Sequence, residues 1–251
     1  MKTHRFLSRL PAVLFLITPG ILQATEKPVH LFILSGQSNM AHLELATDFL
    51  PEAQALLPGA EVVCLKVAVV GEPIRRWLPE WDRIAATAQL GQRNEQGPVY
   101  YEQILAEFQK LQARHPAFAS ITLCWMQGER DAKTGLAAAY ERALTELIAN
   151  LRRDLRYPAM NVVIGRLSDH APGEELQAGW DAVRAAQVNI ARQDPHGAWI
   201  DTDDLNDKMQ DGKPLDDLHY TKAGYALFGQ RLARQGVRLI RGEPPDRAGR
   251  P

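Results

Sequence analysis

The feature that most constrains the fold is the alternation, from Val29 onwards, of short apolar runs with longer segments of helical periodicity. Five runs rich in β-branched and apolar residues predict strands, at 29–34, 61–69, 120–126, 161–167 and 198–202. The segments 99–114, 135–155, 176–193 and 222–236 predict amphipathic helices, because apolar residues recur in them at helical spacing. This alternation is typical of βαβ units and predicts an α/β domain with a central parallel sheet of about five strands.

Length and composition fit one domain with a substantial core. The chain has 251 residues, of which 45% are hydrophobic, and we expect a single domain at 25–240. The segment 75–98 combines tryptophans with Gly and Pro breaks, which predicts an irregular excursion with one short helix at 82–89. The last residues, 241–251, are rich in Gly, Pro and Arg and predict a disordered tail.

The first 24 residues have the pattern of an export signal. Lys2, Arg5 and Arg9 precede an apolar run at 10–22, which is followed by Gln23-Ala24. This order is typical of a secretory signal peptide, and the run is shorter than the roughly 20 residues that span a membrane. We expect cleavage after Ala24 and a secreted or periplasmic protein, with a retained anchor as the alternative.

Charge and cysteine content argue against several other classes of protein. The chain has 29 basic and 30 acidic residues, and residues 1–24 hold three of the basic ones and no acidic one. After cleavage, 26 basic and 30 acidic residues would remain, which gives the mature protein a net charge of about −4. A mildly acidic domain has no electrostatic reason to bind nucleic acid or an anionic membrane surface. Cys64 and Cys124 lie in the second and third predicted strands, which flank the first in a flavodoxin-like order 2-1-3-4-5. We therefore expect two buried, unpaired thiols without a metal role.

A serine turn follows the first predicted strand, in the sequence Ser35-Gly36-Gln37-Ser38-Asn39. A strand that ends in such a turn places a hydroxyl at the carboxyl edge of a parallel sheet, where α/β folds bind ligands. Ser35 is expected to end the strand, whereas Ser38 lies beyond the glycine, so Ser38 is the candidate nucleophile. The structural alternative is an N-cap, since Ser and Asn are preferred at that position.

Three further segments carry the residue types that acyl transfer needs. Gly71 follows the second strand, where a bare backbone amide can approach a ligand closely, although a simple turn is the alternative. Gln127 and Glu129 follow the third strand, and an amide side chain there can donate to an oxyanion. Asp216 precedes His219 by three residues, a spacing that lets a carboxylate orient an imidazole toward a serine. A surface cap is the alternative for this last pair.

Three motifs occur in the order seen in one group of enzymes: Gly36-Gln37-Ser38-Asn39-Met40, Gln127-Gly128-Glu129 and Asp216-x-x-His219. The chain resembles the sialate O-acetylesterase/acetylxylan esterase group, carbohydrate esterase family six, of the SGNH-hydrolase superfamily. The motifs that add support are Gly71-x-x-Ile74-x-x-Trp77, Gly97-Pro98 and Val183-Arg184-x-Ala186-Gln187. The resemblance implies a three-layer α/β/α sandwich and hydrolysis of acetyl esters on sugars without a metal or other cofactor.

The resemblance also implies roles for individual residues. Ser38 matches the nucleophile, His219 the general base and Asp216 the acid that orients the histidine. Glu129 matches an acidic residue that also approaches the histidine, so the orienting acid is Asp216, Glu129 or both. The residues that match the oxyanion hole are Ser38 and Gly71, through their amides, and Gln127, through its side chain.

One departure from the family concerns the pocket beside this site. The family commonly has a Gly-Gly pair before its Ile-x-x-Trp, whereas this chain has Val70-Gly71. The glycine that matches the oxyanion donor is retained, and the pocket is expected to differ. Arg75 and Arg76 add positive charge, which would favour a sugar with a carboxylate such as a sialic or muramic acid; two solvated arginines are the commoner explanation.

The sequence therefore predicts an exported serine esterase that removes O-acetyl groups from a carbohydrate through an acetyl-enzyme intermediate. A metal site made of Glu129, Asp131 and His219 would lack the helical His spacing of zinc motifs. Two other classes of protein stay open: a non-catalytic carbohydrate-binding protein on the same fold, and an SGNH lipase or thioesterase with an apolar acyl groove. An acetylated carbohydrate is the expected partner, and the sequence leaves the oligomeric state open.

Overall fold

The computed structural model describes residues 27–251, so the predicted signal segment at 1–24 lies outside the described residues. A five-stranded parallel sheet forms the centre of the molecule, in the order β2-β1-β3-β4-β5. The strands are β1 (Val29–Gly36), β2 (Glu61–Ala68), β3 (Ser120–Met126), β4 (Asn161–Gly165) and β5 (Gly197–Ile200). All five predicted strands and their flavodoxin-like order are confirmed.

The central strands are apolar on both faces because helices cover both faces of the sheet. Every residue of β3 is buried, as is all of β1 after Val29. Cys64 lies opposite Phe32 of β1, and Cys124 lies opposite Leu34 on the other side of that strand. Both thiols are unpaired, as predicted, but only Cys124 is fully buried.

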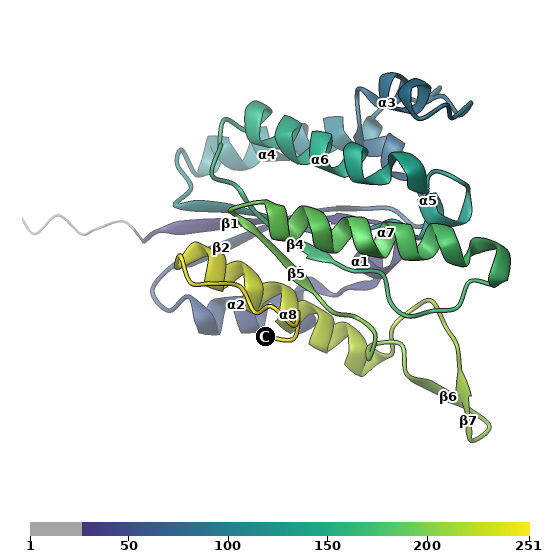
Figure 1. Ribbon diagram of the computed structural model, residues 1–251. Coiled ribbons are helices and arrows are strands. Elements are labelled where there is room, and N and C mark those ends of the chain that lie inside the picture. Colours follow the sequence, from purple (N-terminus) through teal and green to yellow (C-terminus); the bar gives the residue numbers. More distant parts are fainter. Residues whose placement is uncertain (1–26) are drawn as a thin grey trace, which may run out of the picture.

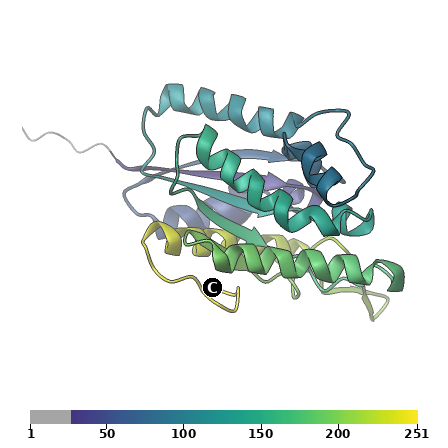
Figure 2. The ribbon, with the colours of Figure 1, turned by 45° about the horizontal axis from the view of Figure 1, so that its top comes forward.

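Helices form a layer on each face, which gives the three-layer α/β/α sandwich (Figure 1). One layer contains α4 (Val99–Arg114), α6 (Ala137–Asp154) and α7 (Glu174–Gln193), which lie side by side in Figure 2. The other contains α2 (Leu50–Leu56) and the last helix, α8 (Lys222–Ile240). No helix of residues 27–251 is long and apolar enough to cross a membrane.

Short elements that the sequence patterns did not predict lie mainly at the carboxyl edge of the sheet. They include α1 (Ser38–His42), a π-helical turn at Leu45–Phe49, a 3-10 turn at Ile74–Trp77 and α5 (Glu129–Lys133). The excursion after β2 contains α3 (Trp81–Thr87), close to the predicted 82–89. An antiparallel hairpin, β6 (Lys208–Gln210) and β7 (Lys213–Leu215), projects from the body at the same edge (Figure 1).

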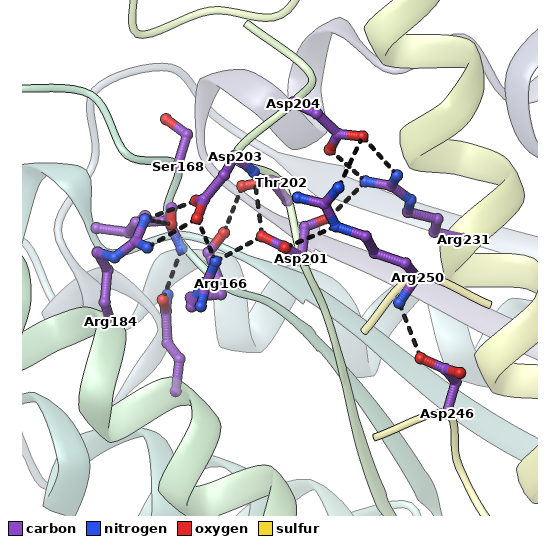
Figure 3. Close-up of polar contacts among 12 residues, drawn as sticks. Arg166, Ser168, Arg184, Asp201, Thr202, Asp203, Asp204, Arg231, Asp246 and Arg250 are labelled. Atoms are coloured by element: carbon purple, nitrogen blue, oxygen red, sulfur yellow. Dashed lines mark hydrogen bonds and ion pairs between the residues drawn. The ribbon is translucent and has the colours of Figure 1, made fainter. Parts of the chain in front are cut away.

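The C-terminal residues 241–251 do not form the disordered tail that their composition predicts. The side chain of Gln235, which is fully buried in α8, donates to the Asp246 carbonyl and accepts from the Asp246 amide. The Gly249 carbonyl accepts from the Asp201 amide, and Arg250 Nε lies 2.8 Å from an Asp201 carboxylate oxygen (Figure 3). Composition misled the prediction because the tail satisfies polar groups of α8 and of the residue after β5, which a local pattern cannot reveal.

Candidate active site

The turn after β1 is fixed by a close approach of β3. Gly36 has a φ of 145°, and a Cβ at this position would overlap the Met126 carbonyl. The next amide, of Gln37, donates to that same carbonyl over 2.8 Å. Only glycine fits here, and the chain then enters α1 with Ser38 as its first residue, at the carboxyl edge of the sheet.

The two serines of the turn have different surroundings. The Ser35 hydroxyl donates to the Val67 carbonyl over 2.6 Å and accepts from the Trp77 indole over 3.0 Å. Its hydrogen-bonding capacity is therefore taken up by partners in the core. Ser38 is 2% exposed, and its hydroxyl forms no hydrogen bond with residues 27–251. The strand does not end at Ser35 as predicted, because β1 continues to Gly36, and Ser38 lies beyond this glycine at the start of α1.

The loop that carries His219 lies against α1. Asn39 Nδ2 donates over 3.2 Å to the carbonyl of Leu218, so residues adjacent to Ser38 and to His219 are in direct contact. The rings of His42 and His219 lie 5.1 Å apart. His219 Nε2 is buried without a partner among the described residues, which leaves it able to accept a proton. Burial, together with the charge of His42, lowers the pKa of His219.

The structure places Asp217, and not Asp216, beside the histidine. The Asp217 carboxylate accepts from the His219 amide over 2.9 Å and lies 3.8 Å from His219 Nδ1. Asp216 instead contacts His170 Nδ1 at 2.8 Å and the Ala171 amide at 3.2 Å, so the predicted pairing of Asp216 with His219 is not formed. Of these two adjacent aspartates, only Asp217 therefore faces the histidine.

Glu129 is buried at the start of α5 and reaches the histidine loop through Asn39. Its Oε1 accepts from Asn39 Nδ2 over 3.2 Å, the same amide that donates to Leu218, while Oε2 has no partner among residues 27–251. Burial raises the pKa of Glu129 to about 7. The structure therefore places Glu129 within the group of site residues, in contact with Asn39 and not with the imidazole.

Gln127 occupies a different role from the predicted oxyanion donor. Its Nε2 contacts the carboxylate of Asp131, the Glu72 carbonyl at 3.2 Å and Gln37 Oε1 at 3.4 Å. Since an amide nitrogen has two protons, these acceptors leave none for an oxyanion. Asp131 in turn accepts from the Ile74 amide at 3.0 Å, so Gln127 and Asp131 fasten the segment after β2 to the end of β3.

Gly71 lines a polar pocket of about 380 Å³. It has a φ of 74°, a conformation that favours glycine. The pocket is lined by Gly71, Glu72, Pro73, Arg75, Gln92, Arg130 and Thr134. Arg75 donates to Gln92 over 2.8 Å, and neither Arg75 nor Arg130 has a carboxylate partner among the described residues. Arg76, by contrast, is buried and paired with Glu72 at 3.5 Å.

Sequence reasoning found the four segments of the site and missed several of the residues that connect them. Asn39 and Asp217 are each the direct neighbour of a residue that was singled out, Ser38 and Asp216 respectively. The adjacency of two aspartates before the histidine was the available signal for Asp217.

Within residues 27–251, no three His, Cys, Asp or Glu side chains are grouped closely enough to hold a metal ion, so Glu129, Asp131 and His219 do not form the alternative metal site.

Solved structures with a similar fold include a carbohydrate acetylesterase. A protein from Arabidopsis thaliana superposes with a TM-score of 0.58 at 19% identity, covering 84% of this chain and 98% of that one. A carbohydrate acetylesterase from Xanthomonas citri gives a TM-score of 0.58 at 16% identity, covering 86% of this chain and 57% of that one. NanS gives 0.57 at 13% identity, covering 86% and 99%. No curated protein sequence matches the chain.

The carboxyl edge of this three-layer α/β/α fold brings the Ser38 turn and the His219 loop into contact through Asn39. Residues 42–238 match the family model described as carbohydrate esterase, sialic acid-specific acetylesterase. The chain belongs to this family of carbohydrate esterases. The matched residues include the His219 segment and begin four residues after Ser38.

Proposed function

We propose that the protein is an exported serine esterase that removes O-acetyl groups from a carbohydrate, with Ser38 as nucleophile and His219 as general base. The observation that carries the proposal is that a serine and a histidine with a free ring nitrogen lie on two segments in direct contact. His219 Nε2 is buried without a partner among the described residues, Ser38 begins α1 at the same edge of the sheet, and Asn39 joins the two segments. Family membership makes the chain an esterase, and this pair supplies the nucleophile and the base that the reaction needs.

In the first half-reaction, Ser38 Oγ attacks the acetyl carbonyl as its proton passes to His219 Nε2. The carbonyl oxygen becomes an oxyanion, and the amides of Ser38 and Gly71 are its proposed donors, since neither donates to another of residues 27–251. The tetrahedral intermediate then releases the sugar hydroxyl, which takes its proton from His219. An acetyl group remains on Ser38.

In the second half-reaction, water attacks the acetyl-enzyme while His219 takes its proton. Collapse releases acetate and returns the proton to Ser38. Asp217, 3.8 Å from Nδ1, is the proposed carboxylate that stabilises the charged imidazole. Glu129 has the proposed task of holding Asn39, which joins the nucleophile segment to the histidine loop.

The pocket beside Gly71 favours a small acyl group on a polar substrate. Apart from Gly71 and Pro73, its lining side chains are polar or charged, which is unlike the apolar acyl groove of a lipase. Arg75 and Arg130 place two guanidinium groups there, and guanidinium groups bind carboxylates well. These features support an acetylated sugar that carries a carboxylate, such as a sialic acid, over an acetylated neutral polymer such as xylan. Export rests on the N-terminal signal pattern alone.

Paired serine substitutions test the proposal. Ser38→Ala is expected to lower the turnover of a small chromogenic acetate by about 10⁴-fold or more while the Tm stays the same. Ser35→Ala is the matched control, because it removes a buried hydroxyl that bonds Val67 and Trp77, and it is expected to lower the stability by about 1–3 kcal/mol with the turnover retained. Full activity of Ser38→Ala would remove the proposal.

A further inference from the structure

A second pocket, of about 560 Å³, lies between the β6–β7 hairpin and the loop that follows β4. Its lining residues are Asp169, Ala171, Asn206, Asp207, Lys208, Met209, Leu215 and Asp216. The reaction proposed above uses none of them. The pocket adjoins the histidine loop, because Lys208 Nζ donates to the Asp217 carboxylate over 2.6 Å and Asn206 Nδ2 donates to the Asp217 carbonyl over 2.9 Å.

The polar lining of this pocket is rich in hydrogen-bond acceptors. Asp169, Asp207 and Asp216 contribute carboxylates, and Lys208, the one basic side chain of the lining, is paired with Asp217. Ionised carboxylates only accept hydrogen bonds, so the pocket favours a ligand that offers donors and disfavours an anion.

Asn206 gives an independent indication of a ligand. Its side chain is 6% exposed, and its Oδ1 has no hydrogen-bond partner among residues 27–251. A buried acceptor without a partner costs about 1–3 kcal/mol, and Asn206 lines the pocket, so a ligand donor that reaches Oδ1 would recover this loss. The same side chain donates through Nδ2 to the carbonyl of Asp217, the residue whose carboxylate lies near His219. A ligand bound at Asn206 would therefore lie next to the Asp217–His219 contact.

The hairpin adds apolar surface to the same pocket. Met209 is 66% exposed and Leu215 is 39% exposed, which makes them two of the four large apolar side chains exposed on the described part of the chain. Acceptors beside apolar side chains match the ring of a neutral sugar, which presents hydroxyl donors at its edge and C–H groups on its faces. A fatty acyl chain offers no donors, and an acidic sugar would face three carboxylates.

We propose that this pocket binds a neutral sugar unit linked to the acetylated sugar, so that acetylated glycan chains are better substrates than acetylated monosaccharides. The inference rests on the proposed function, because it adds a subsite to that active site. The acetylated unit lies at Ser38, the arginine-lined pocket lies beside Gly71, and the hairpin pocket takes the next unit of the chain. Occupation of the subsite would also restrain Asp217 and the histidine loop.

Acetate release from matched substrates tests the subsite. The first pair is O-acetylated sialic acid, free and as the terminal unit of sialyllactose; the second pair is acetylated xylose and acetylated xylotriose. For at least one pair, kcat/KM is expected to be about fivefold to tenfold higher for the longer member, as one or two added hydrogen bonds would give. In the Met209→Ala/Asp207→Ala variant, this ratio is expected to fall to about one. Both side chains are exposed, so the substitutions leave the core intact.

Glu102→Ala, on the exposed surface of α4, is the matched control and is expected to keep the wild-type ratio. Equal kcat/KM values for both members of each pair in the wild type, or a ratio unchanged in the double variant, would overturn the subsite and leave the proposed esterase standing.

A binding measurement separates the subsite from the reaction. Unacetylated xylotriose and lactose are titrated into the protein labelled at its methionine methyl groups, with the Met209 signal assigned through Met209→Leu. The Met209 resonance is expected to shift with saturation for at least one sugar, whether or not the enzyme releases acetate. A Met209 resonance that stays unchanged for both sugars would refute the subsite even if every acetate ester is hydrolysed.

Discussion

At the scale of single residues, the site depends on side chains that join its segments. Asn39 donates both to the Leu218 carbonyl and to Glu129, and it accepts from the Tyr225 hydroxyl over 3.0 Å. One amide side chain therefore connects α1, α5, the histidine loop and α8. A sequence motif reveals that such residues occur, but their partners follow from the fold.

The two adjacent aspartates give a residue-scale prediction. Asp217→Asn is expected to lower kcat/KM by about 10-fold or more, because a neutral amide stabilises the charged imidazole less well than a carboxylate. Asp216→Asn changes the contact with His170 instead, so its effect on a small chromogenic acetate is expected to stay below about threefold. Steady-state kinetics of both variants measure this, and a larger loss in Asp216→Asn would restore the pairing that the sequence predicted.

The pH dependence of the reaction is a second prediction at this scale. The general base must be neutral, and burial lowers the pKa of His219, so the acid limb of kcat/KM is expected below pH 6.5. His42 adds to this shift, since its positive charge opposes protonation of the neighbouring ring. His42→Gln is expected to move the acid limb to higher pH. A pH–rate profile in which the limb stays in place or moves lower would contradict this arrangement of charges.

At the scale of elements, the C-terminal segment 241–251, here called the clasp, binds α8 and the residue that follows β5. It lies beside α8 in Figure 1, and Figure 3 shows Arg250 between the carboxylates of Asp201 and Asp204. The same group of charges extends to Arg166, which contacts both Asp201 and Asp203. Gly249 has a φ of 73°, and a Cβ there would contact the Trp199 ring at 2.9 Å, so the close fit of the clasp requires glycine.

Removal of the clasp is expected to destabilise the protein. A chain that ends at Arg241 loses the Asp246 bonds to Gln235, which leaves a fully buried amide without these partners. The expected cost is about 2–4 kcal/mol, which corresponds to a Tm lowered by several degrees. Arg247→Ala is the control, because Arg247 is exposed and forms no bond with residues 27–251. An unchanged Tm after truncation would mean that the segment contributes nothing.

The accuracy of the sequence-based prediction differed between elements for physical reasons. The strands were predictable because a strand buried on both faces needs a continuous apolar run, as in β1 and β3. The β6–β7 hairpin was not, since strands of three residues carry too little pattern. The order of the site segments followed from motif order, whereas the choice between Asp216 and Asp217 depends on the conformation of the loop before α8, which no local pattern reveals.

At the scale of the whole molecule, the parallel sheet brings four distant segments to one edge. The carboxyl ends of β1, β2 and β3 supply Ser38, Gly71 and the Gln127 segment, and the loop before α8 supplies His219. The resulting surface has arginines beside Gly71 and aspartates beside the hairpin. For the substrate proposed above, a partly acidic glycan, this separation of charge is expected to favour one orientation across the site.

The central claim, that Ser38 is the nucleophile, is tested most directly by covalent labelling. The protein is treated with a serine-directed fluorophosphonate, digested and analysed by mass spectrometry. A single adduct is expected on the peptide that contains Ser38, with labelling slowed strongly in His219→Ala because the serine then lacks its base. The absence of an adduct, or an adduct at any other residue, would contradict the claim.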